Sequence, residues 1–170
     1  MASARMGEMV VSSDPNEELV ALGLGSCIGL AIVDRTAGVA GLAHIVLPES
    51  NDRGEQLGKY ADTAIPELIT RLRQAGAVER RFETAIAGGA RMFEMSGGLD
   101  IGARNEAAVR SALAAAHLTV RAAKTGGTTG RTLKVTLSDL TVTVRSAGEQ
   151  PETLLQGRAP RFTPAAGAAR

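Results

Sequence analysis

Cysteine, histidine and aromatic residues are scarce in this chain of 170 residues, and their scarcity argues against several classes of protein. A single cysteine cannot form a disulfide within the chain, and one cysteine with two histidines falls short of the four ligands of a structural zinc site. Aromatic residues make up 2% of the chain and tryptophan is absent, which disfavours a surface that stacks on bases or sugars. We therefore expect a reducing, cytoplasmic setting and no metal or other cofactor.

Excess charge and long apolar runs are also missing. Nineteen basic and 18 acidic residues leave a net charge of +1, without the basic excess that binds nucleic acid. The longest nearly apolar stretch, residues 19–33, is shorter than the roughly 20 residues of a membrane-spanning helix and is interrupted by glycines. Residues 1–8 lack the apolar core of a signal peptide. The composition predicts one domain with no nucleic-acid partner and no membrane insertion.

What the chain does contain is a cysteine in a setting suited to chemistry. Cys27 follows Gly25 and Ser26, and glycine permits a tight turn in which the amides near Ser26 and Cys27 could face a developing oxyanion. Because the thiolate is the nucleophilic form of cysteine, a nearby imidazole such as that of His44 would activate it by lowering its pKa. The competing interpretation is that Cys27 is a small buried hydrophobe and His44 a core side chain in an apolar run.

Three β-leaning segments surround these two residues, at 18–25, 27–34 and 39–47. The last two segments flank a loop with the composition of a hairpin turn. Counting outward from the centre of that loop pairs Cys27 with about position 46, within one or two residues of His44. The spacing therefore predicts that Cys27 and His44 lie near each other on one antiparallel pair.

The rest of the chain shows helical and strand patterns. Apolar residues at helical spacing predict a helix from Tyr60 to a C-cap at Gly76, and a second helix with Asn105 as its N-cap. Residues 146–170 lack periodicity and are expected to be a mobile tail after a single domain at 1–145. Further strands are predicted at 82–87, 118–123, 131–137 and 140–145. These elements predict an α+β fold with mostly antiparallel strands.

A glycine-rich stretch after the strand at 82–87 carries the apolar pair Met92 and Phe93. Such a pair either anchors a surface loop in the core or contacts a partner protein. Gly25 belongs to a Gly-x-Gly motif, but Ile28 stands where a dinucleotide-binding fingerprint needs a third glycine. The glycine motifs therefore do not indicate a nucleotide cofactor.

In their order and spacing these segments resemble chemotaxis protein CheD, the chemoreceptor glutamine deamidase family. The resemblance covers residues 11–145. Six motifs carry it: LGLGSC at 22–27, AHIVLP at 43–48, KYADTA at 59–64, AGGARMF at 87–93, IGARN at 101–105 and TGG at 125–127. It implies a layered fold with a mostly antiparallel β-sandwich core flanked by two main helices.

The resemblance also implies an activity. Members of this family hydrolyse glutamine side-chain amides on the cytoplasmic helices of membrane chemoreceptors, and some also act on receptor glutamyl methyl esters. Carried over by motif, Cys27 would be the nucleophile that forms a glutamyl thioester, and His44 would be the acid and base. The implied partners are the receptors and a CheC-type phosphatase, and Met92 and Phe93 are the residues we expect to contact them.

One position departs from the family pattern, because the catalytic set of the family includes a threonine where this chain has Ala21. A methyl group cannot hydrogen-bond an imidazole, so another group has to orient His44. The sequence leaves three hypotheses: a working deamidase, a binding module for receptors or a CheC-type phosphatase with little or no catalysis, and a thiol redox switch. The last is disfavoured because no second cysteine could resolve an oxidised one.

Overall fold

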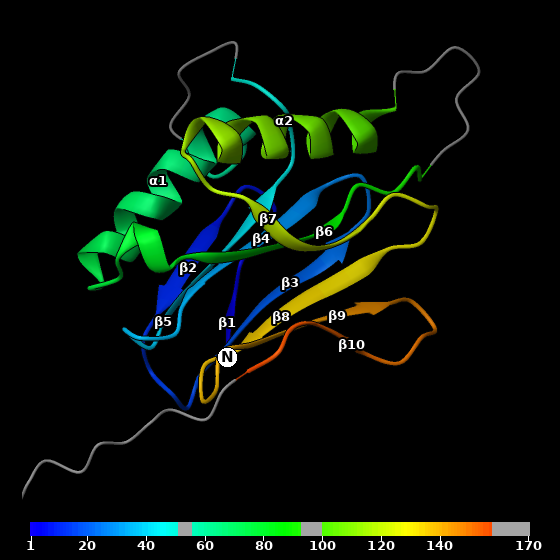
Figure 1. Ribbon diagram of the computed structural model, residues 1–170. Coiled ribbons are helices and arrows are strands. Elements are labelled where there is room, and N and C mark those ends of the chain that lie inside the picture. The colour runs from blue at the N-terminus through cyan, green and yellow to red at the C-terminus, as the bar shows by residue number, and fades with distance from the viewer. Residues whose placement is uncertain (51–55, 93–99, 158–170) are drawn as a thin grey trace, which may run out of the picture.

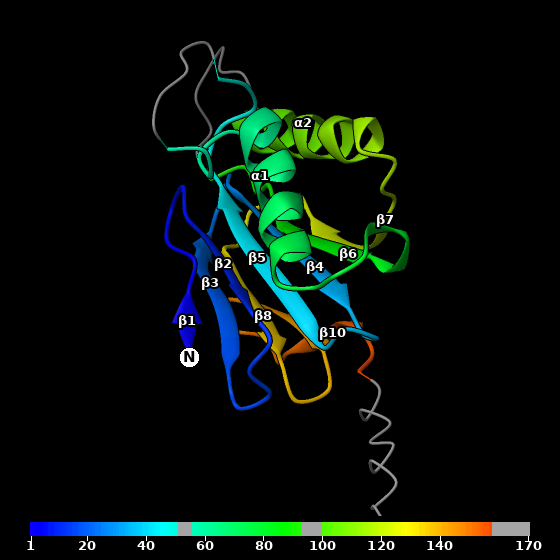
Figure 2. The ribbon, with the colours of Figure 1, turned by 90° about the vertical axis from the view of Figure 1, so that its left-hand side faces the viewer.

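The computed structural model describes residues 1–50, 56–92 and 100–157. Two five-stranded sheets pack face to face, and two helices cover one of these sheets on the face that points away from the other sheet (Figures 1 and 2). The helices are α1 (Ala61–Gln74) and α2 (Ile101–Ala115), and a short 3₁₀ helix, η1, spans Glu79–Arg81. This arrangement confirms the expected α+β fold, a mostly antiparallel sandwich flanked by two helices.

The sheet beneath the helices, called the helix-side sheet, has the strand order β2-β5-β4-β6-β7. Its strands are β2 (Met9–Ser12), β4 (Ile28–Asp34), β5 (Val39–Ile45), β6 (Glu83–Gly88) and β7 (Val120–Thr125). The second sheet, called the outer sheet, has the order β1-β3-β8-β9-β10. Its strands are β1 (Ala2–Ser3), β3 (Glu18–Leu24), β8 (Arg131–Thr136), β9 (Thr141–Ser146) and β10 (Glu152–Leu155). Only the β6–β7 and β1–β3 pairs of these described strands are parallel.

Strands β4 and β5 lie at the centre of the fold, and every one of their residues is buried. Successive side chains of a strand point to opposite faces, so β4 contributes to two cores. Alternate residues Ile28, Leu30 and Ile32 join the core beneath the helices. Ala31 and Val33 join the core between the two sheets. Burial on both faces explains why the sequence of β4 is almost continuously apolar.

The second helix begins earlier than its sequence pattern predicts. Asp100 is the N-cap of α2, and its side chain accepts a hydrogen bond from the Ala103 amide at 3.0 Å. Asn105, the predicted N-cap, instead lies inside the helix and is fully buried. Gly102 lies in the first turn of α2, where a glycine is needed because the Gly89 backbone occupies the place of a side chain.

The outer sheet continues beyond the domain boundary predicted after Arg145. In β10, Leu155 pairs with Val142 of β9 and is buried in the core between the sheets. The segment 146–170, expected to be a mobile tail, therefore contributes a strand to the fold. A four-residue edge strand with one buried side chain has too little periodicity to be recognised from sequence. Residues 158–170 lie outside the described residues.

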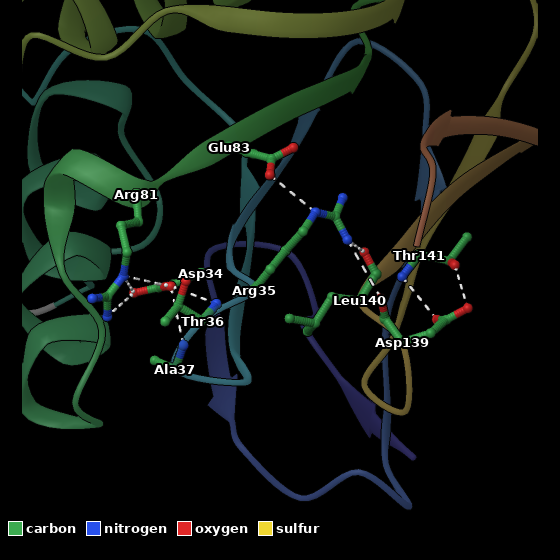
Figure 3. Close-up of polar contacts among 9 residues, drawn as sticks. All are labelled: Asp34, Arg35, Thr36, Ala37, Arg81, Glu83, Asp139, Leu140 and Thr141. Carbon is green, nitrogen blue, oxygen red and sulfur yellow. Dashed lines mark hydrogen bonds and ion pairs between the residues drawn. The ribbon is translucent and has the colours of Figure 1, made fainter. Parts of the chain in front are cut away.

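A buried carboxylate organises the end of the sandwich where β4 finishes (Figure 3). Asp34 is fully buried and accepts hydrogen bonds from the amides of Thr36, Ala37 and Val78 and from the Arg81 guanidinium. Burial by itself raises the pKa of Asp34, but the bonds from Arg81 and the amides outweigh it and lower the pKa below 3.8. The β4–β5 turn is thus attached to the chain that leads into β6.

The neighbouring Arg35 ties the same turn to the outer sheet (Figure 3). Its Nε bonds Glu83 Oε1 at 2.9 Å, while Nη1 donates to the Leu140 carbonyl at 3.0 Å in the β8–β9 turn. One side chain therefore joins the two sheets at the end of β4.

Replacing Asp34 tests this cluster. We expect Asp34→Ala to lower the free energy of unfolding by about 3 kcal/mol, because removing one partner of a buried pair leaves its hydrogen-bond donors unpaired. Since the folded-state pKa of Asp34 is lowered, the stabilisation is present at neutral pH and is lost as the pH falls below 3.8 through the folded-state value. Urea unfolding at several pH values measures both effects.

A suitable control is Glu67→Ala, which removes an exposed ion pair with Arg71 on α1. We expect that change to cost about 0.5 kcal/mol or less. Equal losses for the two variants would show that the Asp34 cluster does not stabilise the fold.

Candidate active site

Cys27 lies in the turn between β3 and β4, and its side chain is on the face of the helix-side sheet that packs against the outer sheet. Ile28 pairs with Ile45, and Gly29 pairs with His44. This register confirms the pairing of Cys27 with position 46 that the hairpin composition predicts. Residues two apart on a strand share a face, so the Cys27 thiol and the His44 imidazole lie on the same face as diagonal neighbours.

The turn that carries Cys27 is held through its backbone carbonyls, at the end of the sandwich where β3, β6 and β7 finish (Figure 1). Three consecutive carbonyls each accept a hydrogen bond from the segment that runs from β6 into α2. The pairs are Ala90 N to Gly25 O at 2.8 Å, Asn105 Nδ2 to Ser26 O at 2.9 Å and Gly89 N to Cys27 O at 2.9 Å. Within the described residues, the Ser26 and Cys27 amides donate to no carbonyl. No carbonyl therefore competes for these two donors, which makes both amides candidates for holding an oxyanion.

Two glycines at the end of β6 make this contact with the turn feasible. Gly88 and Gly89 have φ values of +114° and +66°, and a Cβ on Gly88 would overlap the Cys27 carbonyl. Only glycine adopts such a conformation at that distance without strain. The AGGARMF motif thus supports the cysteine-bearing turn.

Arg131 at the start of β8 belongs to the same region, and the sequence patterns did not single it out. Its side chain is 8% exposed, and Nη1 donates to the carbonyls of Gly88 at 3.2 Å and Gly126 at 2.8 Å. It therefore fastens the ends of β6 and β7 to the outer sheet. An arginine in register with the buried residues Leu133 and Val135 was the signal that could have revealed it.

His44 is 2% exposed and is oriented by main chain. Its Nδ1 lies 3.3 Å from the Ala4 carbonyl, which can only accept a hydrogen bond, so the proton belongs on Nδ1. Nε2 is then an unprotonated base; it is buried and has no hydrogen-bond partner among the described residues. This tautomer is the one that a general base requires.

The Ala4 carbonyl lies beside the position where the family pattern has a threonine. Ser3 pairs with Val20, and the Ala4 amide donates to the Val20 carbonyl at 2.9 Å, which places Ala4 next to Ala21. Both alanines are buried in the core between the sheets. A backbone oxygen thus contacts the imidazole although residue 21 has no hydroxyl.

Burial favours the uncharged form of both the thiol and the imidazole in the free protein. Burial raises the pKa of Cys27 above its ordinary value of 9.0, and the amide of Cys27 itself counteracts this only in part. Burial also lowers the pKa of His44 below 6.5, against the smaller effect of the Ala4 carbonyl. The expected low thiol pKa is therefore wrong for the free protein, because both groups are desolvated and no hydrogen bond joins them.

Met92 covers part of the same turn. Its side chain lies against Gly25, where a Cβ would collide with the Met92 thioether, yet 44% of Met92 remains exposed. An exposed apolar side chain next to Cys27 is suited to contact a substrate or partner protein. Phe93, the other member of the predicted contact pair, lies outside the described residues.

The described residues also bear on metal binding and on membrane insertion. In that part of the chain, no three His, Cys, Asp or Glu side chains are grouped to hold a metal ion. None of the helices described there combines the length and apolarity needed to cross a membrane.

A thiol, an imidazole and two amides that have no carbonyl partner among the described residues are the components with which cysteine-dependent acyl-transfer enzymes work. The chain belongs to the CheD family. A family model described as CheD chemotactic sensory transduction matches residues 46–146.

Relatives extend the similarity over most of the chain. A chemoreceptor glutamine deamidase CheD from Thermotoga maritima is 41% identical over 143 residues, which are 84% of this chain and 90% of the relative. A probable chemoreceptor glutamine deamidase CheD from Symbiobacterium thermophilum is 43% identical, over 84% of this chain and 90% of the relative. One from Methanococcus maripaludis is 40% identical, over 85% and 94%. The resemblance inferred from six motifs is confirmed.

The resting protonation state can be tested by alkylation of Cys27, the only cysteine in the chain. We expect iodoacetamide to react slowly at pH 7 and its rate to rise with an inflection above pH 9.0, because burial raises the thiol pKa. Mass spectrometry would measure the alkylation rate from about pH 6 to about pH 11, a range that spans the ordinary thiol pKa. The urea-unfolded chain is the control. A plateau reached below neutral pH would instead show a preformed thiolate and imidazolium pair.

Proposed function

We propose that this protein is a cytoplasmic protein-glutamine amidohydrolase that converts specific glutamines on chemoreceptor helices to glutamate and releases ammonia. The names and identities of its relatives support this substrate class. The observation that carries the chemistry is the unpartnered, buried Nε2 of His44 on the same face as the Cys27 thiol. An unprotonated nitrogen in that position can accept the thiol proton when a substrate carbonyl is bound beside Cys27.

The first half of the reaction forms a thioester. A glutamine carbonyl approaches Cys27, and its oxygen takes the hydrogen bonds offered by the Ser26 and Cys27 amides. His44 Nε2 removes the thiol proton as the sulfur attacks the carbonyl carbon. The C–N bond then breaks, the imidazolium gives its proton to the departing nitrogen, and ammonia leaves.

The second half returns the enzyme to its starting state. His44, neutral again, removes a proton from water, and the resulting oxygen attacks the thioester carbon. The C–S bond breaks, the proton returns to the thiolate, and glutamate is released. A glutamyl methyl ester would give the same thioester with methanol as leaving group, so we include receptor methylesterase activity in the proposal.

The neutral resting state has a functional rationale. A bound substrate helix supplies the carbonyl that the sulfur attacks. The negative charge that develops on its oxygen is then stabilised by the amides of the turn. Proton transfer to His44 is then coupled to attack on the carbonyl, and the thiol of the free enzyme is protected from adventitious electrophiles.

We also propose the partners that the family resemblance implies. The exposed part of Met92 would contact the receptor helix that carries the glutamine, or a CheC-type phosphatase that competes for the same surface. An apolar side chain beside the nucleophile suits an amphipathic helix in either case.

Deamidation is tested with a chemoreceptor cytoplasmic fragment and peptide mass spectrometry. We expect the wild-type protein to convert specific glutamines to glutamates, and Cys27→Ala and His44→Gln each to lower the rate by about 10³-fold or more. Retained binding of the fragment by both variants is the control. Binding without conversion by the wild-type protein would overturn the enzyme proposal in favour of a binding module.

A second test concerns the alanine at the family threonine position. Because the Ala4 carbonyl already bonds Nδ1 of His44, we expect Ala21→Ser to change kcat by less than about threefold, whereas loss of an orienting group costs orders of magnitude. Deletion of residues 2–5, which removes that carbonyl, should lower kcat far more. A large gain in kcat for Ala21→Ser would show that His44 is poorly oriented without a hydroxyl.

A further inference from the structure

Asn105 connects the two chain segments that carry Cys27 and His44. It lies in α2, is fully buried, and its Nδ2 donates to the carbonyls of Ser26 and Val46, each at 2.9 Å. Ser26 immediately precedes the thiol, and Val46 follows the imidazole by two residues. One amide group thus cross-links the β3–β4 turn and the end of β5.

The orientation of this amide is determined by its neighbours. Both partners are carbonyl oxygens, which only accept hydrogen bonds, so the NH₂ group has to face them. Oδ1 then points away and has no partner within the described part of the chain. A buried acceptor without a donor costs stability, but an apolar side chain at this position would take the Nδ2 hydrogen bonds away from both carbonyls. The amide is therefore the group that joins the two segments.

The hydrogen bond to Ser26 has a direct geometric consequence for Cys27. The Ser26 carbonyl and the Cys27 amide belong to the same planar peptide unit, and in a trans peptide they point in opposite directions. The chain has no cis peptide bond among its described residues. Because Asn105 bonds the Ser26 carbonyl from α2, the Cys27 N–H is turned the other way, away from α2.

We propose that Asn105 is a positioning residue that aims the Cys27 amide at the substrate oxyanion and holds the cysteine-bearing turn against the strand of His44. It contacts no reacting atom and acts through the Ser26 and Val46 carbonyls. The proposal rests on the proposed function, because it assumes that Cys27 attacks a carbonyl carbon.

The first test compares Asn105→Ala and Asn105→Leu with Val109→Ala. Val109 lies on the same helix and is fully buried in the core beneath the helices, so it controls for loss of packing. We expect both Asn105 variants to lower kcat for deamidation by about 100-fold with KM changed by less than about threefold, as for a misdirected oxyanion donor. Val109→Ala should keep kcat within about threefold at a similar loss of melting temperature. Wild-type kcat in the Asn105 variants would overturn the proposal.

The second test does not depend on deamidation. With the turn released, Cys27 becomes more exposed and its pKa moves back toward 9.0, so we expect iodoacetamide to react at least about fivefold faster at pH 8 in both Asn105 variants. Val109→Ala should react at the wild-type rate. If the wild-type protein deamidates nothing, the proposed function fails, and this comparison alone decides whether Asn105 holds the turn. A rate within about twofold of wild type in the Asn105 variants would overturn the proposal.

Discussion

The antiparallel register between β4 and β5 is the constraint on which the rest of the structure depends. Pairing Ile28 with Ile45 directs alternate side chains of both strands into one core beneath the helices and another between the sheets. The same register places Gly29 opposite His44 and so brings the imidazole near Cys27. A shift by one residue would exchange the two faces and separate the thiol from the base.

Backbone groups perform most of the positioning at the candidate site. The carbonyls of residues 25 to 27 accept hydrogen bonds from the two amides that follow β6 and from Asn105, and the imidazole of His44 contacts the carbonyl of Ala4. Such contacts use main-chain atoms and do not require a particular side chain at the position that carries the carbonyl. Burial disfavours the charged forms of the thiol and the imidazole, because no charged side chain bonds either group in the described structure.

Local patterns predicted the elements well and their long-range contacts poorly. The hairpin, both helices and the proximity of Cys27 to His44 could be predicted, because turn composition and apolar spacing determine register and periodicity. The contacts of Asn105 could not be predicted, because asparagine is a good N-cap residue in isolation and its hydrogen-bond partners are distant in the chain. The expectation that the pKa of Cys27 is lowered was also wrong, because sequence spacing indicates a nearby imidazole but does not show that the thiol is buried.

The sequence by itself determined the family, the alternation of strands and helices, and the pair of residues that could perform the chemistry. These properties reside in short motifs and in the residues on either side of one turn. Only the tertiary structure decided which groups surround that pair, because Ala4, Asn105 and Arg131 come from three separate parts of the chain: Ala4 contacts the imidazole, Asn105 bonds the Ser26 carbonyl and Arg131 bonds the end of β6. Packing also decided the protonation state, since the exclusion of water from Cys27 and His44 is a property of the assembled layers.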